Sequence, residues 1–263
     1  MFRKLVTMTA VTAGVLLLAG AALAQSGVSF KDPSNDDNGP GNYTYPTDQV
    51  YKRGSFDMTA FDVKASGKKV DFGVTFASPL EDPWRMGGGF SVQMVFIFID
   101  NKEGGQKEGP PGTNVTFAEG NEWDYMVILS PQPSGRVKTE VEQKMAAQQA
   151  SVIIPIRVKG AGRTISATVD LDQLGGGDPS QWGYQVVVQS NEGFPEGKDL
   201  LTRKVNEYEG QHRFGGGNDG DCDPHAVDIL DDGEGSQKAM LKYECNPDGS
   251  TKQGAVLKMV HKK

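Results

Sequence analysis

The run FSVQMVFIFID at residues 90–100 constrains the fold more than any other part of the sequence. It is rich in aromatic and β-branched residues, and no polar side chain interrupts it between Gln93 and Asp100. It is too short to cross a membrane as a helix, which requires about 20 apolar residues. Its length and composition are typical of a strand that is buried on both faces. We therefore predict a central β-strand at residues 90–100.

Several other short runs also have the pattern of strands. Residues 69–77 (KVDFGVTFA) alternate apolar and polar side chains, and Ser66-Gly67-Lys68 forms a predicted hairpin turn to a strand at residues 55–64. Further strands are predicted at residues 123–130, 150–159, 164–171 and 182–190, with a short one at 238–243. Residues 175–181 (GGGDPSQ) predict a turn with a short helical bend. Residues 139–149 are compatible with a helix or a strand.

The connections between these runs indicate the fold class. The sequence contains 34 glycines, and turn-forming clusters recur between the predicted strands. Strands do not alternate with helices, as they would in a parallel α/β sheet. The pattern predicts an all-β protein, an antiparallel β-sandwich with few short helical turns.

The first 24 residues have the pattern of a secretory signal peptide. Arg3 and Lys4 precede a long apolar stretch, and Ala22-Leu23-Ala24 matches a cleavage signal. No cysteine follows the apolar stretch, so a lipid anchor is not expected, and no later segment is apolar enough to be a transmembrane anchor. We expect a soluble protein that is secreted, or held in the periplasm or cell envelope.

Charge and length limit the partners and the number of domains. The full chain has a formal net charge of −7, and removal of a leader with two basic and no acidic residues gives −7 − 2 = −9. Such an acidic surface repels nucleic acid, so nucleic acid is not an expected partner. The remaining 263 − 24 = 239 residues suit one large β domain, which we place at residues 25–243. Residues 244–263 form a predicted basic C-terminal tail.

The chain has two cysteines, Cys222 and Cys245. In an exported protein an isolated pair of this kind predicts a disulfide. Closing a loop of just over twenty residues stabilises the folded state by about 3 kcal/mol.

The segment DPSNDDNGPGNYTYPT at residues 32–47 concentrates hard oxygen ligands between prolines and glycines. Calcium takes six to eight such oxygens. The spacing does not fit an EF-hand loop, so a site here requires ligands from elsewhere in the chain. The candidate calcium ligands are Asp32, Asn35, Asp36, Asp37, Asp57 and Asp100. Asx turns, in which these side chains cap their own backbone, are the alternative, and both interpretations stay open.

Aromatic and polar side chains supply candidates for sugar binding. Tyr43 and Tyr45 lie on one side of the chain if the segment is extended, and could stack on sugar rings. Packing against the sandwich is the more common role for tyrosines of this kind. Trp84 and Arg85 in a predicted loop, and Gln93 if it faces outward, complete the candidate carbohydrate-binding set.

Catalytic motifs give no support for an enzyme. The sequence contains neither the G-x-S-x-G motif of serine hydrolases nor a C-x-x-C-H haem attachment motif, and its three histidines all lie in the last quarter of the chain. Paired carboxylates can always be chosen from 34 acidic residues, so they decide nothing. We expect a protein that is not an enzyme.

Several separated motifs together resemble one family. They are, in order along the chain, DPSNDDNGPGNYTYPT, GSFDMTAFDV, DPW, GFSVQ, WGYQVVVQS, FGGG and AVDIL. Their order is similar to that of the glucodextranase C-terminal-like domain, a DOMON-like β-sandwich related to family nine carbohydrate-binding modules. The resemblance extends from residue 30 to about residue 241, and the opening motif is its most specific part.

The resemblance implies a non-catalytic sandwich that binds a glycan or cell-envelope polysaccharide, with structural calcium as a cofactor. Two alternatives remain open at the level of the sequence. One is a structural protein of a surface layer or envelope assembly, which binds envelope proteins through the same sandwich. The other is a haem-binding redox module of the DOMON type.

Overall fold

The computed structural model describes residues 26–231, 233 and 237–262. The predicted signal peptide at residues 1–24 lies outside the described residues. No helix among the described residues is long and apolar enough to span a membrane.

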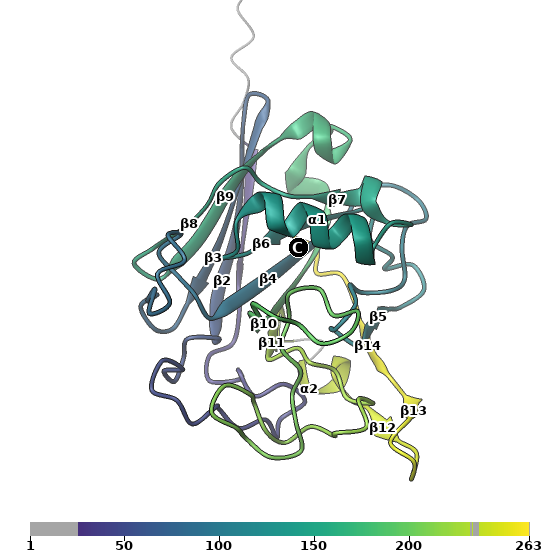
Figure 1. Cartoon of the computed structure of the whole chain (residues 1–263). Coiled ribbons are helices and arrows are strands. Elements are labelled where there is room, and N and C mark those ends of the chain that lie inside the picture. The colour runs from purple at the N-terminus through teal and green to yellow at the C-terminus, as the bar shows by residue number, and fades with distance from the viewer. Residues whose placement is uncertain (1–25, 232, 234–236, 263) are drawn as a thin grey trace, which may run out of the picture.

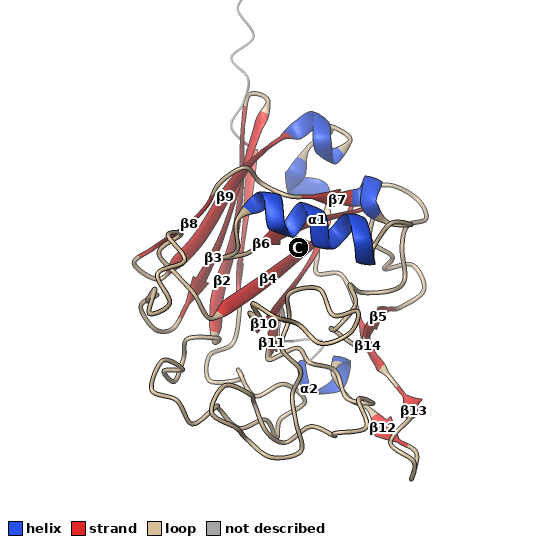
Figure 2. Ribbon diagram, in the orientation of Figure 1, coloured by secondary structure: helices blue, strands red, loops and turns tan. Residues whose placement is uncertain are grey.

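Two five-stranded sheets form the body of the protein (Figures 1 and 2). The first sheet is antiparallel throughout and has the order β1 (Ser26–Lys31), β2 (Met58–Ser66), β3 (Lys69–Phe76), β9 (Thr164–Asp170), β8 (Val158–Ala161). The second has the order β11 (Asp228–Ile229), β10 (Gly183–Ser190), β4 (Gln93–Asp100), β6 (Tyr125–Leu129), β7 (Val152–Ile153). The predicted all-β sandwich is confirmed, with the qualification that β7 pairs with β6 in parallel.

The main hydrophobic core lies between the two sheets. Alternate residues of each strand face it, among them Phe61, Phe72, Val95, Ile97, Ile99, Tyr184 and Val186. These side chains are at most 1 % exposed. The alternation in β2 and β3 follows from the period of two in an extended strand, which directs successive side chains to opposite faces.

A second core covers the outer face of the second sheet. Met94, Phe96 and Phe98 of β4 pack there against Val137 and Val141 of α1 (Ser134–Lys144). Strand β4 is therefore buried on both faces at the centre of its sheet, which confirms the prediction for residues 90–100. Helix α1 lies across this sheet in Figure 1 and resolves the open choice at residues 139–149 in favour of a helix that ends at residue 144.

Short elements complete the connections. Three single turns of 3-10 helix occur at Gln149–Ser151, Leu171–Leu174 and Pro179–Gln181. The last of these confirms the helical bend expected in residues 175–181. The short strand predicted at residues 238–243 is wrong, because helix α2 (Gln237–Met240) occupies its first part. Gln237 and Met240 are both buried, and side chains three residues apart share one face of a helix.

The segment predicted as a basic tail packs onto the sandwich. Strands β12 (Glu244–Cys245) and β13 (Thr251–Gln253) pair with each other, and β14 (Ala255–Leu257) pairs in parallel with β5 (Val115–Phe117). Val260 then exchanges two backbone hydrogen bonds with Tyr184 of β10, at 2.7 and 2.9 Å. Ala255, Leu257, Met259 and Val260 are buried, and their burial holds the segment in place despite its lysines.

The disulfide predicted between Cys222 and Cys245 is present, with its Cα atoms 5.6 Å apart. It attaches β12 to the loop that precedes β11, and it closes a loop with a sequence separation of 23. We expect the double variant Cys222→Ala with Cys245→Ala to lose about 3 kcal/mol of unfolding free energy, because the unfolded chain regains the loop entropy. Urea unfolding of both proteins under oxidising conditions measures the difference. Equal unfolding free energies would contradict the expectation.

Candidate functional site

Three aspartates from distant parts of the sequence meet beside the first sheet. Asp32 follows β1, Asp36 lies in the loop after it, and Asp228 begins β11. One carboxylate oxygen of each lies within 4.8 Å of the others. Asp57, which directly precedes β2, is close enough for its charge to raise the pKa of both Asp32 and Asp36. We call Asp32, Asp36, Asp57 and Asp228 the acidic cluster.

Backbone hydrogen bonds hold three members of the acidic cluster by one oxygen each. Oδ1 of Asp32 accepts from the amide of Asp231 at 2.7 Å. Oδ2 of Asp57 accepts from the amide of Asn35 at 2.9 Å. Oδ2 of Asp228 accepts from the amide of Met58 at 2.6 Å. These bonds orient the carboxylates and leave the second oxygen of each for another partner.

The second oxygens find no such partner among the described residues. Oδ2 of Asp32 and Oδ1 of Asp36, Asp57 and Asp228 are all buried without a hydrogen bond. Buried polar atoms are nearly always paired, since an unpaired one loses its hydration without compensation. Four such oxygens lie in the acidic cluster, where a cation could pair with them.

Three carboxyl groups of the acidic cluster have raised pKa values. Burial, together with the charges of the neighbouring aspartates, raises the pKa of Asp32 to about 9. Burial and the neighbouring carboxylates also raise the pKa of Asp36, to about 6. The pKa of Asp228, which is fully buried, is raised for the same two reasons. The raised pKa values mean that burial and mutual repulsion disfavour the ionised form of these carboxyl groups.

The donor set fits calcium. All four side chains offer carboxylate oxygens, the ligands preferred by hard divalent cations, and the cluster contains neither sulfur nor imidazole for a softer metal. The loop that carries Asp36 is built tightly enough to hold such a site. The side-chain amide of Gln237 in α2 donates to the carbonyl oxygens of Asp36 and Gly39. A Cβ atom at Gly39, where φ is +60°, would overlap the ring of Tyr43.

Only three of the six predicted calcium ligands lie in the acidic cluster. Asp32, Asp36 and Asp57 belong to the acidic cluster. Asn35 contributes its backbone amide, and Asp37 accepts a hydrogen bond from the hydroxyl of Tyr45. Asp100 pairs with Gly183 at one end of β10, whereas Asp228 pairs with Val188. Five residues of strand separate these positions by roughly 17 Å, so Asp100 is remote from the cluster.

Sequence reasoning did not place Asp228 among the predicted calcium ligands. It lies in the run AVDIL at residues 226–230, where the flanking apolar residues are at most 1 % exposed. An aspartate inside a run that must be buried is the signal that could have identified it, because a buried charge needs a partner.

The predicted carbohydrate-binding residues are mostly part of the core. Tyr43 is only 5 % exposed, and its hydroxyl bonds to Pro224 and Asp223. Tyr45 packs its ring on Phe56 and Phe214. Both tyrosines thus take the packing arrangement that was the alternative to sugar stacking.

The other three candidates differ in exposure. Gln93 is 1 % exposed and its amide donates to the carbonyl of Ser55 at 2.8 Å, so it presents no surface to a sugar. Trp84 is partly buried against Tyr51 and His212, with the guanidinium of Arg203 over its ring. Arg85 is exposed.

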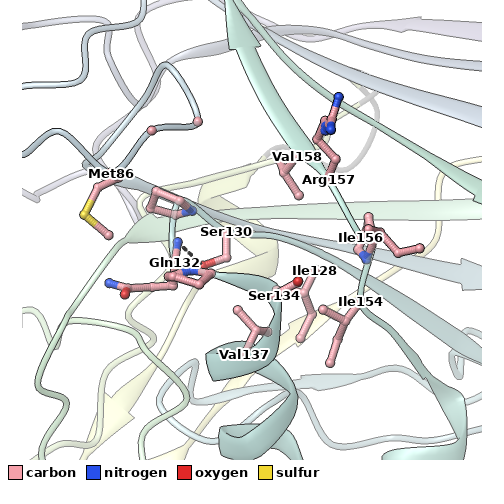
Figure 3. A pocket seen from close by; sticks show the side chains of 15 residues that line it. Met86, Ile128, Ser130, Gln132, Ser134, Val137, Ile154, Ile156, Arg157 and Val158 are labelled. Atoms are coloured by element: carbon pink, nitrogen blue, oxygen red, sulfur yellow. Dashed lines mark hydrogen bonds between the residues drawn. The ribbon is translucent and has the colours of Figure 1, made fainter.

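A groove of about 240 Å³ lies between the start of α1 and the segment that links β7 to β8 (Figure 3). Aliphatic side chains and prolines form most of its lining, including Ile128, Val137, Ile154, Pro131 and Pro155. Ile156 stands at its edge and is 95 % exposed. The lining contains no aromatic ring, so it lacks the stacking surface that sugars favour.

The raised pKa values predict that the unfolding free energy depends on pH in the presence of a chelator. Between about pH 4 and pH 9 the folded chain binds more protons at Asp32 and Asp36 than the unfolded chain does. The unfolding free energy should therefore fall as the pH rises through this window. We expect the melting temperature in EDTA to decrease from pH 5 to pH 9 more steeply for the native sequence than for Asp32→Asn. Parallel profiles of the two proteins would contradict this expectation.

Comparison with known proteins identifies the family of the chain. A family model described as the C-terminal binding module, SLH-like, of glucodextranase matches residues 28–259. No curated protein matches the chain significantly. The matched region begins in β1 and ends after β14, so it contains both sheets, the acidic cluster and the disulfide.

Proposed function

We propose that this chain is an exported, non-catalytic protein that binds carbohydrate. It belongs to the family of SLH-like C-terminal binding modules of glucodextranase. The observation that carries the proposal is the family match, which extends over residues 28–259 rather than over a single motif. The ligand is a glycan or a polysaccharide of the cell envelope.

Calcium is proposed as the structural cofactor of this module. Asp32, Asp36 and Asp228 would hold it through oxygens that lack a partner, with the carboxylate of Asp57 beside them. A bound divalent cation supplies the positive charge that these buried carboxylates lack. Since the ligands come from β1, the loops after it and β11, the ion would fasten the N-terminal segment to the edge of the second sheet.

Two features of the structure support the non-catalytic and exported parts of the proposal. Glycoside hydrolysis uses two carboxylates placed on either side of a bound glycosidic bond. Asp57 and Asp228 of the acidic cluster are 2 % and 0 % exposed, which leaves no room there for a sugar chain. The disulfide fits an oxidising compartment outside the cytoplasm.

One observation favours a second candidate, a structural protein of an envelope assembly. Ile156 at the groove of Figure 3 is 95 % exposed and lies next to β7, the two-residue edge strand of the second sheet. Together with the aliphatic and proline lining of the groove, Ile156 forms an apolar patch of the kind found at protein contact surfaces.

A thermal-shift series tests the proposed function. The purified protein is melted with chelator or calcium, and then with α-glucans, β-glucans and cell-wall fragments. A ligand that binds only the folded state raises the melting temperature by mass action. We expect a rise with calcium and a further rise with at least one glycan. A rise with calcium and none with any glycan would favour the envelope-assembly candidate instead.

A further inference from the structure

A large cleft with several charged residues in its lining lies at the other end of the second sheet, roughly 17 Å from the acidic cluster along β10. Its walls come from the end of β4, the loops that follow β4 and precede β6, the 3-10 turn Pro179–Gln181, the start of β10 and the C-terminal segment. The lining residues used below are Asp100, Lys102, Glu103, Glu122, Asp178, Trp182, Gly183 and His261. We call it the Trp182 cleft.

We propose that the Trp182 cleft is the site at which this protein binds an uncharged pyranose saccharide. The inference rests on the proposed function, since it names where and with what chemistry the glycan is bound. Its volume of about 620 Å³ is within the range of known small-ligand sites, roughly 300–1,000 Å³. The groove of Figure 3, at about 240 Å³, is below that range.

Trp182 gives the first specific argument. Its side chain borders the cleft, and its indole Nε1 makes no hydrogen bond with any residue that the structure describes. Nε1 is not among the side-chain atoms that are buried without a partner, so its N–H stays accessible although the rest of the ring packs in the core. A sugar hydroxyl in the cleft supplies an acceptor for this N–H.

Asp100 gives the second argument. Its carboxylate lines the cleft and forms neither a hydrogen bond nor an ion pair with any residue in the described ranges. Partial burial, together with the charges of Asp124 and Glu122, raises its pKa. A carboxylate with two free oxygens accepts hydrogen bonds from adjacent sugar hydroxyls, which replace the water lost on burial.

Gly183 shapes the floor of the cleft. A Cβ atom at this position would lie 2.6 Å from Cε1 and 3.0 Å from Nε2 of His261, so only glycine allows the imidazole to rest against the start of β10. Gly183 is also the β-sheet partner of Asp100. The C-terminal segment is thereby held beside the carboxylate, and the ring adds a donor or acceptor to the same wall.

The charge of the lining selects the class of sugar. Asp100, Glu103, Glu122 and Asp178 contribute four negative charges and Lys102 one positive charge, which gives 1 − 4 = −3 with His261 neutral. Such a cleft repels uronates, sulfates and phosphates. Neutral hydroxyls donate to its carboxylates without that repulsion, so the ligand is an uncharged saccharide rather than an acidic one.

Calorimetric titration with defined trisaccharides tests the assignment. The probes are isomaltotriose, maltotriose and cellotriose, with trigalacturonate as the acidic comparison. The variants are Trp182→Phe, which keeps the packing and removes the N–H, Asp100→Asn, and Gly183→Ala, which displaces His261. Phe194→Ala, at a ring that is 88 % exposed and outside the cleft lining, is the control.

We expect at least one neutral trisaccharide to bind, its affinity to fall about tenfold or more in each cleft variant, and the control to bind as the native protein does. Calcium-dependent melting of every variant shows that the fold is intact. Neutral-sugar binding that is unchanged in all three cleft variants would overturn this inference and leave the proposed function standing. Tighter binding of trigalacturonate would overturn the assigned sugar class. Binding of no saccharide in this set or in the thermal-shift series would overturn both proposals.

Discussion

Calcium added to chelator-treated protein should raise its melting temperature by about 8–16 °C when the ion is at a thousandfold excess over its Kd. The expected gain is about 4 kcal/mol, because an ion that binds only the folded chain stabilises it by mass action. The structural reason is the acidic cluster, where four buried carboxylate oxygens lack partners. Differential scanning calorimetry in EDTA and in calcium measures the shift.

Asp228→Asn separates calcium binding from other effects of calcium. The amide oxygen of asparagine can still accept from the amide of Met58, so the strand geometry is preserved. The variant should lose most of the calcium-dependent gain. In EDTA it should melt at or above the native temperature, since one of the mutually repelling buried charges is gone. Asp172→Asn, at an exposed aspartate, is the matched control and should keep the full gain. A full calcium response in Asp228→Asn would contradict the assignment of the site.

Phe56→Ala should have the largest effect of any single core substitution proposed here, a loss of about 3–5 kcal/mol of unfolding free energy. Phe56 is fully buried and contacts three other rings, with ring centroids 5.9 Å away for Tyr45, 6.2 Å for Tyr51 and 5.0 Å for Phe214. Its removal leaves a cavity directly beside Asp57. Urea unfolding measures the loss.

The control for Phe56→Ala is again Phe194→Ala. Because Phe194 is 88 % exposed, its truncation should change the unfolding free energy by no more than about 0.5 kcal/mol. A loss of less than about 1 kcal/mol in Phe56→Ala would show that the aromatic side chains around Tyr45 are loosely packed. They would then be available for sugar stacking, contrary to the packing described above.

The strands of the sandwich could be predicted because their signal is local. The apolar run at residues 90–100 predicts a strand buried on both faces, and β4 is that strand. The alternation at residues 69–77 predicts a strand buried on one face, and β3 is that strand. Helix α2 could not be predicted in the same way. It is held by tertiary hydrogen bonds from the side chain of Gln237 to the carbonyl oxygens of Asp36 and Gly39, which no short window of sequence contains.

In the candidate sites, too, residues close in sequence could be predicted together, whereas residues brought together by strand pairing could not. The acidic segment at residues 32–47 supplied Asp32 and Asp36, and Asp57 was predicted as a ligand from outside it. Asp228 joins them only because β11 pairs with β10 at the end of a long irregular segment. Asp100 was predicted as a calcium ligand, and Trp182 begins the strand predicted at residues 182–190 and belongs to the main core. They line one cleft because the pairing of β4 with β10 places the end of one strand beside the start of the other.

The central claim is that this protein binds a glycan without cleaving it. Calorimetric titration of the calcium-loaded protein with the saccharide that gives the largest thermal shift tests it most directly, provided that the saccharide is recovered afterwards and analysed by chromatography. The account predicts a saturable heat with one site per chain and a saccharide recovered intact. Shortened saccharide products would contradict the non-catalytic assignment, and the absence of a saturable heat would contradict carbohydrate binding itself.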